Sequence, residues 1–260
     1  DDARFVFLSN LSSSNNGDAG LEFNRANDIE SGSGDVRCTS CSSTNDARGV
    51  SITDSVDLYL HGLQIHDPVV GPAISIDNSG LNIGVQGGLF HLQNVESWIN
   101  YSGPAIDISG AEGVIDGLDM YGSHTGLVWD ADHNVERESV LSNANLSGTG
   151  CLNLSNHDQL SGSGNVITTG CTGTIDFENV ELNWTTLEDQ SSHVLNVDTD
   201  SHLHLHQPIT VDYSIANIDG NGWIEEAWDL NIWVVNNNSN GVPNAMVNLL
   251  PDQLENTMSN

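Results

Sequence analysis

Oxygen-bearing side chains alternate over residues 217–224, in the pattern of the first half of a calcium-binding loop. The donors at loop positions one, three and five are Asn217, Asp219 and Asn221. The last loop position holds Trp228 where such a loop has a bidentate glutamate, so Glu225 or Glu226 would have to supply that ligand. The pattern predicts a calcium site formed by Asn217, Asp219, Asn221 and Glu225, and no other cofactor. The alternative is an Asp-Gly and Asn-Gly turn that leads into a strand.

Histidine and leucine alternate from His202 to His206. On a strand, the three imidazoles would project from one side and Leu203 and Leu205 from the other. Imidazoles at this spacing could bind zinc or copper if a fourth ligand came near. The alternative is the polar outer side of a strand whose leucines fill the core.

Two aromatic residues, Trp98 and Tyr101, fall in the segment Val95 to Ser102, which is expected to be an inserted loop. Exposed aromatic rings can stack on the apolar C–H face of a sugar, so the two residues are candidate carbohydrate contacts. The alternative is packing of the loop against the coil below.

The four cysteines suggest two disulfides. Cys38 and Cys41 could close a small loop, while the second half that a zinc site would need is missing from the sequence. Cys151 and Cys171 each follow a glycine and are 20 residues apart. If that distance is one turn of a repeat, neighbouring strands about 4.8 Å apart would allow a disulfide between them. Two disulfides indicate an oxidising compartment.

The chain is strongly acidic, with 36 Asp and Glu residues against five Arg and no Lys, and a formal net charge of -31. Binding to nucleic acid or to an anionic membrane needs clustered cations, which this composition lacks. No stretch approaches the roughly 18 to 20 apolar residues of a membrane-spanning helix. The charge is typical of a solvated, salt-tolerant surface.

Six N-x-Ser/Thr sequons are candidate glycosylation sites: Asn10, Asn100, Asn145, Asn153, Asn183 and Asn237. The chain opens on Asp1-Asp2 without a Met, a basic segment or an apolar segment, so it looks like a mature product whose signal has been removed. With the cysteines, these features favour a secreted glycoprotein.

Apolar couplets with one residue between their members recur along residues 49–207. They are Val50/Ile52, Ile74/Ile76, Ile106/Ile108, Leu127/Trp129, Leu152/Leu154, Ile175/Phe177 and Leu195/Val197, at steps of 24, 32, 21, 25, 23 and 20 residues. Each couplet is a strand too short to bury its apolar side alone, so a regular recurrence means that coils stack around one core. A second series, Gly62–Ile65, Gly88–Phe90 and Gly117–Met120, is expected at another place in the coil.

These residues resemble the right-handed parallel β-helix repeats of the pectate-lyase-like superfamily. The resemblance covers residues 49–207 and implies an all-β solenoid. It does not imply an activity, because that class includes lyases, glycosidases, tailspikes, adhesins and surface proteins without catalysis. Residues 1–48 are expected to form an N-terminal cap with a Cys-closed loop. Residues 208–260 are expected to form a short β-sandwich-like segment, because 229–249 resembles the opening hairpin of a carboxypeptidase-regulatory-like or other Ig-like domain; only about half of such a domain would remain.

The sequence lacks the residues that the enzymes of that superfamily usually use for catalysis. The lyases use an Arg or Lys base, and the coils contain only Arg137. For a glycoside hydrolase, Asp107, Asp116 and Asp119 are available near His124, and two carboxylates could act as acid and base. The Gly-His-Gly and Arg-Ile-Lys elements of the polygalacturonase-like branch are absent.

The sequence therefore favours a secreted, non-catalytic β-helix that acts as an extracellular structural or adhesive module. Its expected partners are other copies of the chain, stacked end to end or joined by strand complementation into a filament, and glycans. The composition resembles surface proteins of marine or salt-adapted archaea. The alternative function is a secreted carbohydrate-binding or polysaccharide-degrading β-helix.

Overall fold

The computed structural model describes residues 5–24, 35–53, 58–77, 89–100, 103–123, 126–131, 139–147, 152–162, 166–169, 174–184, 187–189, 194–206, 216–227 and 239. Every regular element in this part of the chain is a β-strand, which confirms the all-β prediction. The described residues include no helix that is long and apolar enough to cross a membrane. All described strands belong to one compact unit, Asp1–Ala227.

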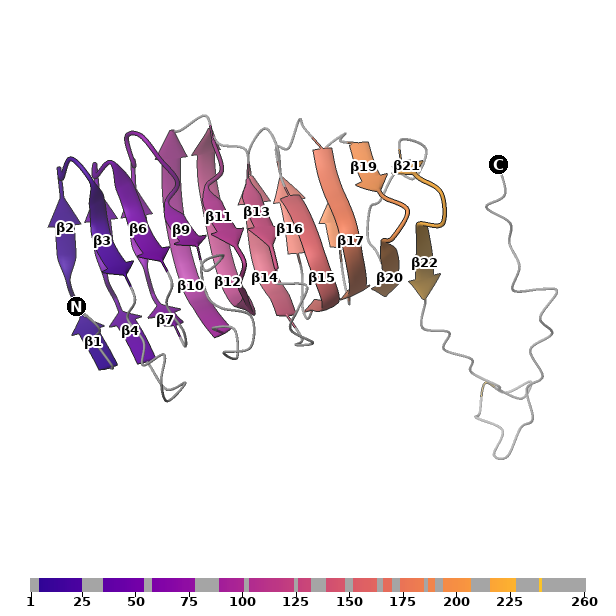
Figure 1. The fold of residues 1–260 in the computed structure, drawn as a ribbon, viewed down its shortest axis with the longest axis horizontal. Coiled ribbons are helices and arrows are strands. Elements are labelled where there is room, and N and C mark those ends of the chain that lie inside the picture. The colour runs from indigo at the N-terminus through magenta and orange to yellow at the C-terminus, as the bar shows by residue number, and fades with distance from the viewer. Residues whose placement is uncertain are drawn as a thin grey trace. The chain divides into compact units, whose positions relative to one another are not determined.

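The strands form a parallel β-solenoid, in which each strand pairs with its counterparts in the coils before and after it (Figure 1). The pairing defines three faces. Face 1 contains β1 (Phe5–Ser9), β4 (Asp35–Thr39), β7 (Leu58–His61), the first parts of β10 (Leu89–Asn100), β12 (Glu112–Ser123) and β14 (Ser139–Ser147), the last parts of β15 (Leu152–Gly162) and β17 (Thr174–Trp184), β20 (His202–His206) and β22 (Trp223–Ala227).

Face 2 contains β2 (Ser12–Ser14), β5 (Ser42–Thr44), β8 (Gln64–His66), the last parts of β10, β12 and β14, β16 (Val166–Thr169) and β18 (Leu187–Asp189). Face 3 contains β3 (Ala19–Asn24), β6 (Arg48–Thr53), β9 (Ile74–Asp77), β11 (Ile106–Ser109), β13 (Leu127–Asp130), the first parts of β15 and β17, β19 (Val194–Val197) and β21 (Ala216–Ile218).

The predicted couplets pair along face 3 in two rows. The first members pair in the order Val50, Ile74, Ile106, Leu127, Leu152, Ile175 and Leu195. The second members form the neighbouring row, which includes Trp129 and Phe177, both buried. Alternation along each strand directs one set of side chains inward and the other outward. The sequence prediction of a coil repeat is therefore confirmed strand by strand.

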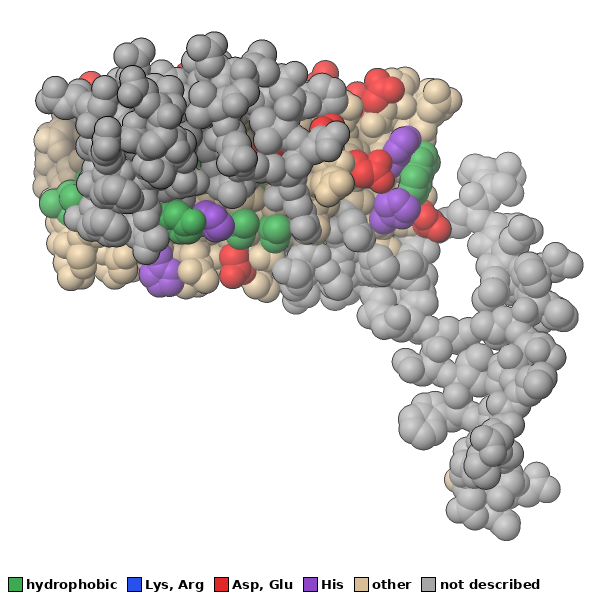
Figure 2. All heavy atoms as spheres, turned by 60° about the horizontal axis from the view of Figure 1, so that its bottom comes forward, with side chains coloured by type: hydrophobic (Ala, Val, Ile, Leu, Met, Phe, Trp, Pro, Cys, Tyr) green, Lys and Arg blue, Asp and Glu red, His purple; other side chains and the backbone are tan. Residues whose placement is uncertain are grey.

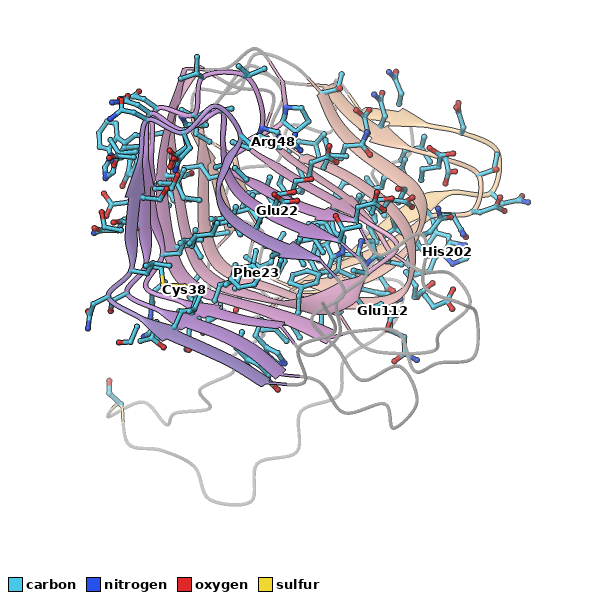
Figure 3. The ribbon with its side chains drawn as sticks, turned by 60° about the vertical axis from the view of Figure 1, so that its left-hand side comes forward. Glu22, Phe23, Cys38, Arg48, Glu112 and His202 are labelled. Carbon is cyan, nitrogen blue, oxygen red and sulfur yellow. A yellow bond between two sulfur atoms is a disulfide. The ribbon has the colours of Figure 1, made fainter. Side chains whose placement is uncertain are left out.

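Inward side chains from all three faces meet in one continuous core. Face 1 contributes Leu60 and Leu92, face 2 contributes Ile65 and Met120, and all four are buried. Figure 3 shows Phe23 and Cys38 on the inside of the coil. Cys38 forms the predicted disulfide with Cys41, whose side chain is also buried.

A column of left-handed backbone conformations marks the corner between faces 1 and 2. Its members, each with a φ between 48° and 76°, are Asn10, Ser40, Gly62, Asn94, Gly117 and Asn143. Gly and Asn adopt this conformation most readily, so their recurrence directs the chain from one face to the next. At Gly117 a side chain would also be crowded, because a Cβ would lie 2.8 Å from the Asn94 side-chain oxygen.

The parallel pairing extends further than the predicted coil limits of 49–207. β1, β2 and β3, which precede residue 49, pair with the strands of the next coil. β21 and β22, which follow residue 207, pair with β19 and β20. The sandwich-like segment after Ala227, apart from Ser239, lies outside the described residues. The right-handed sense of the coil stays a prediction.

Two local predictions were wrong. The segment from Val95 was expected to be a loop, but β10 runs without interruption from Leu89 to Asn100 and crosses from face 1 to face 2. The segment Gly88–Phe90 was expected to share a coil position with Gly62–Ile65 and Gly117–Met120, but Phe90 pairs with Leu58 on face 1. The reason is the same in both cases. β10 is one long strand that contributes to faces 1 and 2, so its sequence does not show the short strand with a single apolar couplet that the repeat predicts.

One buried histidine lies in the core among these rows. His157 contacts the Trp129 ring edge to face, with ring centroids 4.7 Å apart, and its Nε2 lies 3.3 Å from the Trp129 carbonyl oxygen. Burial lowers the pKa of His157 to about 4, although the Trp129 carbonyl and Asp130 act in the opposite direction. The fold therefore keeps this side chain neutral at pH 7.

We predict that Trp129→Ala destabilises the solenoid by about 3–5 kcal/mol, because it leaves a cavity between stacked rungs. The change also removes the hydrogen bond of 2.8 Å from the Trp129 indole nitrogen to the Ala111 carbonyl. Urea unfolding gives the free energy. Val128→Ala, one residue away on the outward side of β13, is the matched control and should cost well under half as much. Equal losses would contradict the assignment of the inward row.

We also predict that His157 makes the protein less stable as the pH falls from about 6.5 towards 4. In that range the unfolded chain binds a proton that the folded chain does not, so folding loses free energy, up to roughly 3 kcal/mol. Urea unfolding at pH 7 and pH 5 should show a loss about 2 kcal/mol larger for the wild type than for His157→Gln. Parallel pH dependence of the two proteins would show that His157 is not responsible.

Candidate functional site

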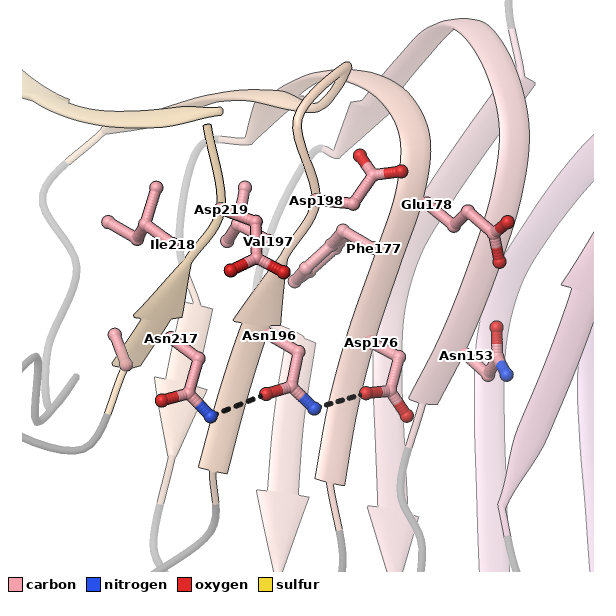
Figure 4. A pocket seen from close by; sticks show the side chains of 11 residues that line it. Asn153, Asp176, Phe177, Glu178, Asn196, Val197, Asp198, Asn217, Ile218 and Asp219 are labelled. Atoms are coloured by element: carbon pink, nitrogen blue, oxygen red, sulfur yellow. Dashed lines mark hydrogen bonds between the residues drawn. The ribbon is translucent and has the colours of Figure 1, made fainter. Parts of the chain in front are cut away.

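A groove of about 770 Å³ lies on face 3 of the C-terminal coils (Figure 4). One row of polar side chains runs along it, with one residue on each rung: Asn153, Asp176, Asn196 and Asn217. Three further carboxylates line the groove where the strands of face 3 end: Glu178, Asp198 and Asp219. The groove is thus lined by amides and carboxylates together with the apolar residues Phe177, Val197, Ala216 and Ile218.

Hydrogen bonds join the polar row from rung to rung. The side-chain amide nitrogen of Asn217 donates to the side-chain oxygen of Asn196 at 3.0 Å, and the Asn196 amide donates to the carboxylate of Asp176. Parallel pairing places these outward positions directly in line, which is why residues about 20 positions apart in sequence meet. Figure 4 shows the two bonds in sequence along the groove. We call Asp176, Asn196 and Asn217 the amide ladder.

Asp198 holds the turn that follows β19. Its carboxylate accepts hydrogen bonds from the Ser201 hydroxyl at 2.7 Å and from the backbone amides of Asn179 and Asp200, each at 3.1 Å. Desolvation raises the pKa of Asp198, but these hydrogen bonds outweigh it and hold the pKa below its ordinary value. Asp198 is therefore an ionised structural residue, and its Oδ1 accepts all three bonds, from within the turn and from Asn179 on the preceding rung.

The predicted calcium ligands occupy two places in the structure. Asn217 lies on β21, while Asp219 and Asn221 lie in a turn closed by a hydrogen bond of 2.9 Å from the Gly222 amide to the Asp219 carbonyl. Glu225 lies on face 1, where its carboxylate is 3.0 Å from His204 Nδ1. Across the described part of the chain, no group of three or more His, Cys, Asp or Glu side chains is arranged to hold a metal ion. Calcium binding stays a prediction.

The histidine strand has the predicted alternation, with Leu203 and Leu205 buried and His202 and His204 half-buried on the outside. Glu181 on the preceding rung lies 3.0 Å from His202 Nδ1 and 3.7 Å from His204 Nε2. The Trp223 ring on the following rung stacks on His202 and meets His204 edge to face. Figure 2 shows histidine, acidic and apolar side chains gathered at this end of face 1. The side chain of His206 is outside the described part.

Trp98 is an exposed aromatic residue on face 2, with 46% of its surface accessible. Its ring stacks on Tyr121, the register partner on the next rung, with centroids 4.6 Å apart and an interplanar angle of 24°. The indole nitrogen donates to Glu96 Oε1 at 3.1 Å, and Gln64 donates to the other oxygen of Glu96 at 3.5 Å. We call Trp98, Tyr121, Glu96 and Gln64 the aromatic shelf.

The surroundings of Tyr121 in the aromatic shelf raise the pKa of its phenol. Burial raises the pKa of Tyr121, and the charges of Asp119 and Glu96 raise it further. The phenol is therefore neutral across the physiological range and can donate a hydrogen bond. Sequence reasoning found Trp98 but not Tyr121, because the two residues are adjacent only through the register of β10 and β12.

The three aspartates considered for acid–base chemistry lie on different parts of the coil. Asp107 is on β11 of face 3, Asp116 is at the end of face 1, and Asp119 is on face 2. The structure does not bring them together. Burial raises the pKa of Asp107, and Asp77 on the neighbouring rung adds to this effect. His124 lies outside the described residues.

The remaining predicted site residues are only partly described. Among the sequons, Asn10 is exposed at a corner, Asn145 is half-buried on face 2 and Asn153 is exposed in the groove. Asn100 and Asn183 are described in their backbone only. The residues that lie outside the described part are Tyr101, Cys151, Cys171 and Asn237.

Comparison with known proteins finds no matching family model, no matching curated protein and no matching solved structure. The assignment of a function therefore rests on the surfaces described above.

Proposed function

We propose that this protein is an extracellular structural and adhesive module whose solenoid holds glycans on its outer surface. The observation that carries the proposal is the aromatic shelf, in which Trp98 and Tyr121 stack on adjacent rungs while Trp98 stays about half exposed. Removing an aromatic ring from water is favourable. A large ring that stays exposed on a rigid strand therefore indicates a surface that binds a ligand or partner.

The polar neighbours of the two rings suit a sugar. Glu96 and Gln64 lie beside Trp98 on the same face, and carboxylate and amide groups accept and donate hydrogen bonds to hydroxyls. An apolar surface with a few placed polar groups is the usual composition of a small-molecule site. The strand holds each group in position, so little conformational freedom is lost on binding.

The negative charge of the shelf and of the whole chain favours neutral glycans over anionic ones. The shelf contains Glu96 and adjoins Asp119, and the whole chain carries a net charge of -31. A polyuronate would be repelled by this surface. We therefore assign neutral glycans as the ligand class, with the module acting without catalysis outside the cell.

We predict that Trp98→Ala and Tyr121→Ala each weaken binding of a neutral β-1,4-linked glucan oligosaccharide. Truncation of an aromatic residue at the centre of a contact costs about 2 kcal/mol, which is roughly a 30-fold loss of affinity. Isothermal titration calorimetry measures it.

The matched control for this experiment is Tyr59→Ala. Tyr59 is also exposed and also stacked on a neighbouring rung, on His91, but it lies on face 1. Unchanged affinity in the two shelf variants, or an equal loss in Tyr59→Ala, would contradict the proposal.

Self-association is the second candidate, and the outermost described rungs favour it. Leu11 and Ile218 occupy inward positions of the coil, yet they are 40% and 47% exposed. The two ends of a parallel ladder are complementary, so one copy could add its β1–β3 rung to the β21–β22 rung of another. Such a contact is heterologous and does not close, which gives a filament.

For self-association we expect concentration-dependent growth of the wild-type protein in sedimentation velocity and filaments in negative-stain images. Ile218→Asp should abolish both, because it places a charge in the apolar contact. Val69→Asp, at an exposed apolar residue in a corner, is the control. Repeating both measurements in the presence of calcium tests whether the predicted calcium site affects self-association. Monomers at all concentrations, with and without calcium, would exclude this candidate.

A further inference from the structure

We infer that the groove on face 3 is a second glycan site, separate from the aromatic shelf, which takes a neutral polyhydroxylated chain laid along the solenoid axis. The inference rests on the proposed function for the class of ligand, and on the amide ladder for the site. No residue of the groove belongs to the shelf, which lies on face 2.

The ladder leaves hydrogen-bonding capacity for a ligand. A side-chain amide has two N–H donors and a carbonyl that accepts two bonds. In the ladder, Asn196 and Asn217 each use one N–H towards the preceding rung, and the Asn196 carbonyl accepts one bond. Asn217 is exposed, and Asn196 and Asp176 are half-buried. Each rung therefore presents remaining donors and acceptors to the groove.

The spacing of the ladder favours a chain over a compact ligand. Asp176, Asn196 and Asn217 are register partners on successive rungs, and parallel strands lie about 4.8 Å apart. A side-chain oxygen, from a carboxylate at Asp176 and from amides at Asn196 and Asn217, thus recurs at a constant interval along the axis. A polymer of hydroxyl-bearing units laid along that axis would find an equivalent set of partners at every rung.

The charge of the groove excludes anionic chains. Asp176, Glu178 and Asp219 contribute carboxylates in addition to Asp198, whose Oδ1 holds the turn. Carboxylates accept hydrogen bonds from hydroxyls, and they repel uronates and phosphates. Of the apolar lining residues, Phe177 and Val197 are buried in the core, so Ile218, which is 47% exposed, is left to contact the C–H face of a sugar ring.

The sequon at Asn153 lies in this groove, so a glycan attached there would occupy the same space as the ligand. The test therefore uses protein produced without N-glycosylation. The probe is a neutral β-1,4-linked glucan oligosaccharide, and the readout is the number of bound equivalents per chain in equilibrium dialysis, with the affinity of each from calorimetry.

We expect two equivalents for the wild type. Asn196→Ala should remove the groove equivalent or weaken it about tenfold, because it breaks the ladder on both sides. Asn217→Ala is a second variant at the exposed end of the ladder, where folding depends less on the side chain. Gln93→Ala, an outward amide on face 1 that contacts His61, is the matched control and should bind like the wild type. Thermal unfolding checks that each variant is folded.

The outcomes separate the groove from the shelf. Loss of one equivalent in Asn196→Ala or Asn217→Ala, with the other removed by Trp98→Ala, supports both sites. Loss of all binding in Trp98→Ala, with the ladder variants like the wild type, overturns the groove and leaves the proposed function standing. Loss of all binding in the ladder variants alone supports the groove and overturns the shelf. No binding to the wild type overturns both.

Discussion

The structure depends on the burial of inward apolar rows between stacked rungs. A single coil offers only a few inward side chains, such as Ile106 and Ile108 on face 3, and these cannot be removed from water unless coils lie on both sides. Every coil must therefore keep its strands in register with the coils beside it, since a slip of one residue would turn the apolar side chains outward. The corner residues with left-handed backbone, such as Asn94 and Gly117, are what make this register possible.

The same constraint decides where chemistry can occur on the surface. Once the inward rows are aligned, the outward side chains are aligned as well, and like or complementary groups from distant parts of the sequence come together in rows. The amide ladder, the stacked Trp98 and Tyr121, and the contacts of Glu181 with His202 and His204 all arise in this way. Rows along the axis are suited to extended ligands, and this common origin links the shelf and the groove to the adhesive function that we propose.

The core of the fold could be predicted from the sequence, because the couplets are local signals. Leu127 and Trp129 mark an inward pair whatever strand they contact, and their recurrence implies stacking. The surface sites could not be predicted in the same way. Asp176, Asn196 and Asn217 are ordinary polar residues in sequence, and they become a ladder only through the register of β17, β19 and β21. Trp98 was recognised as exposed but was placed in a loop, because a strand that supplies two faces breaks the short-strand pattern.

The acidic surface restricts the ligands that the protein can bind. A surface with a net charge of -31 and no lysine should take uncharged chains and reject anionic ones. The most direct measurement is the binding of the wild-type protein to neutral and uronate oligosaccharides of equal length, at low and at physiological ionic strength. We predict binding of the neutral chain that changes little with salt, and no binding of the uronate in low salt, where repulsion is least screened. Absence of neutral binding, or tighter binding of the uronate, would contradict it.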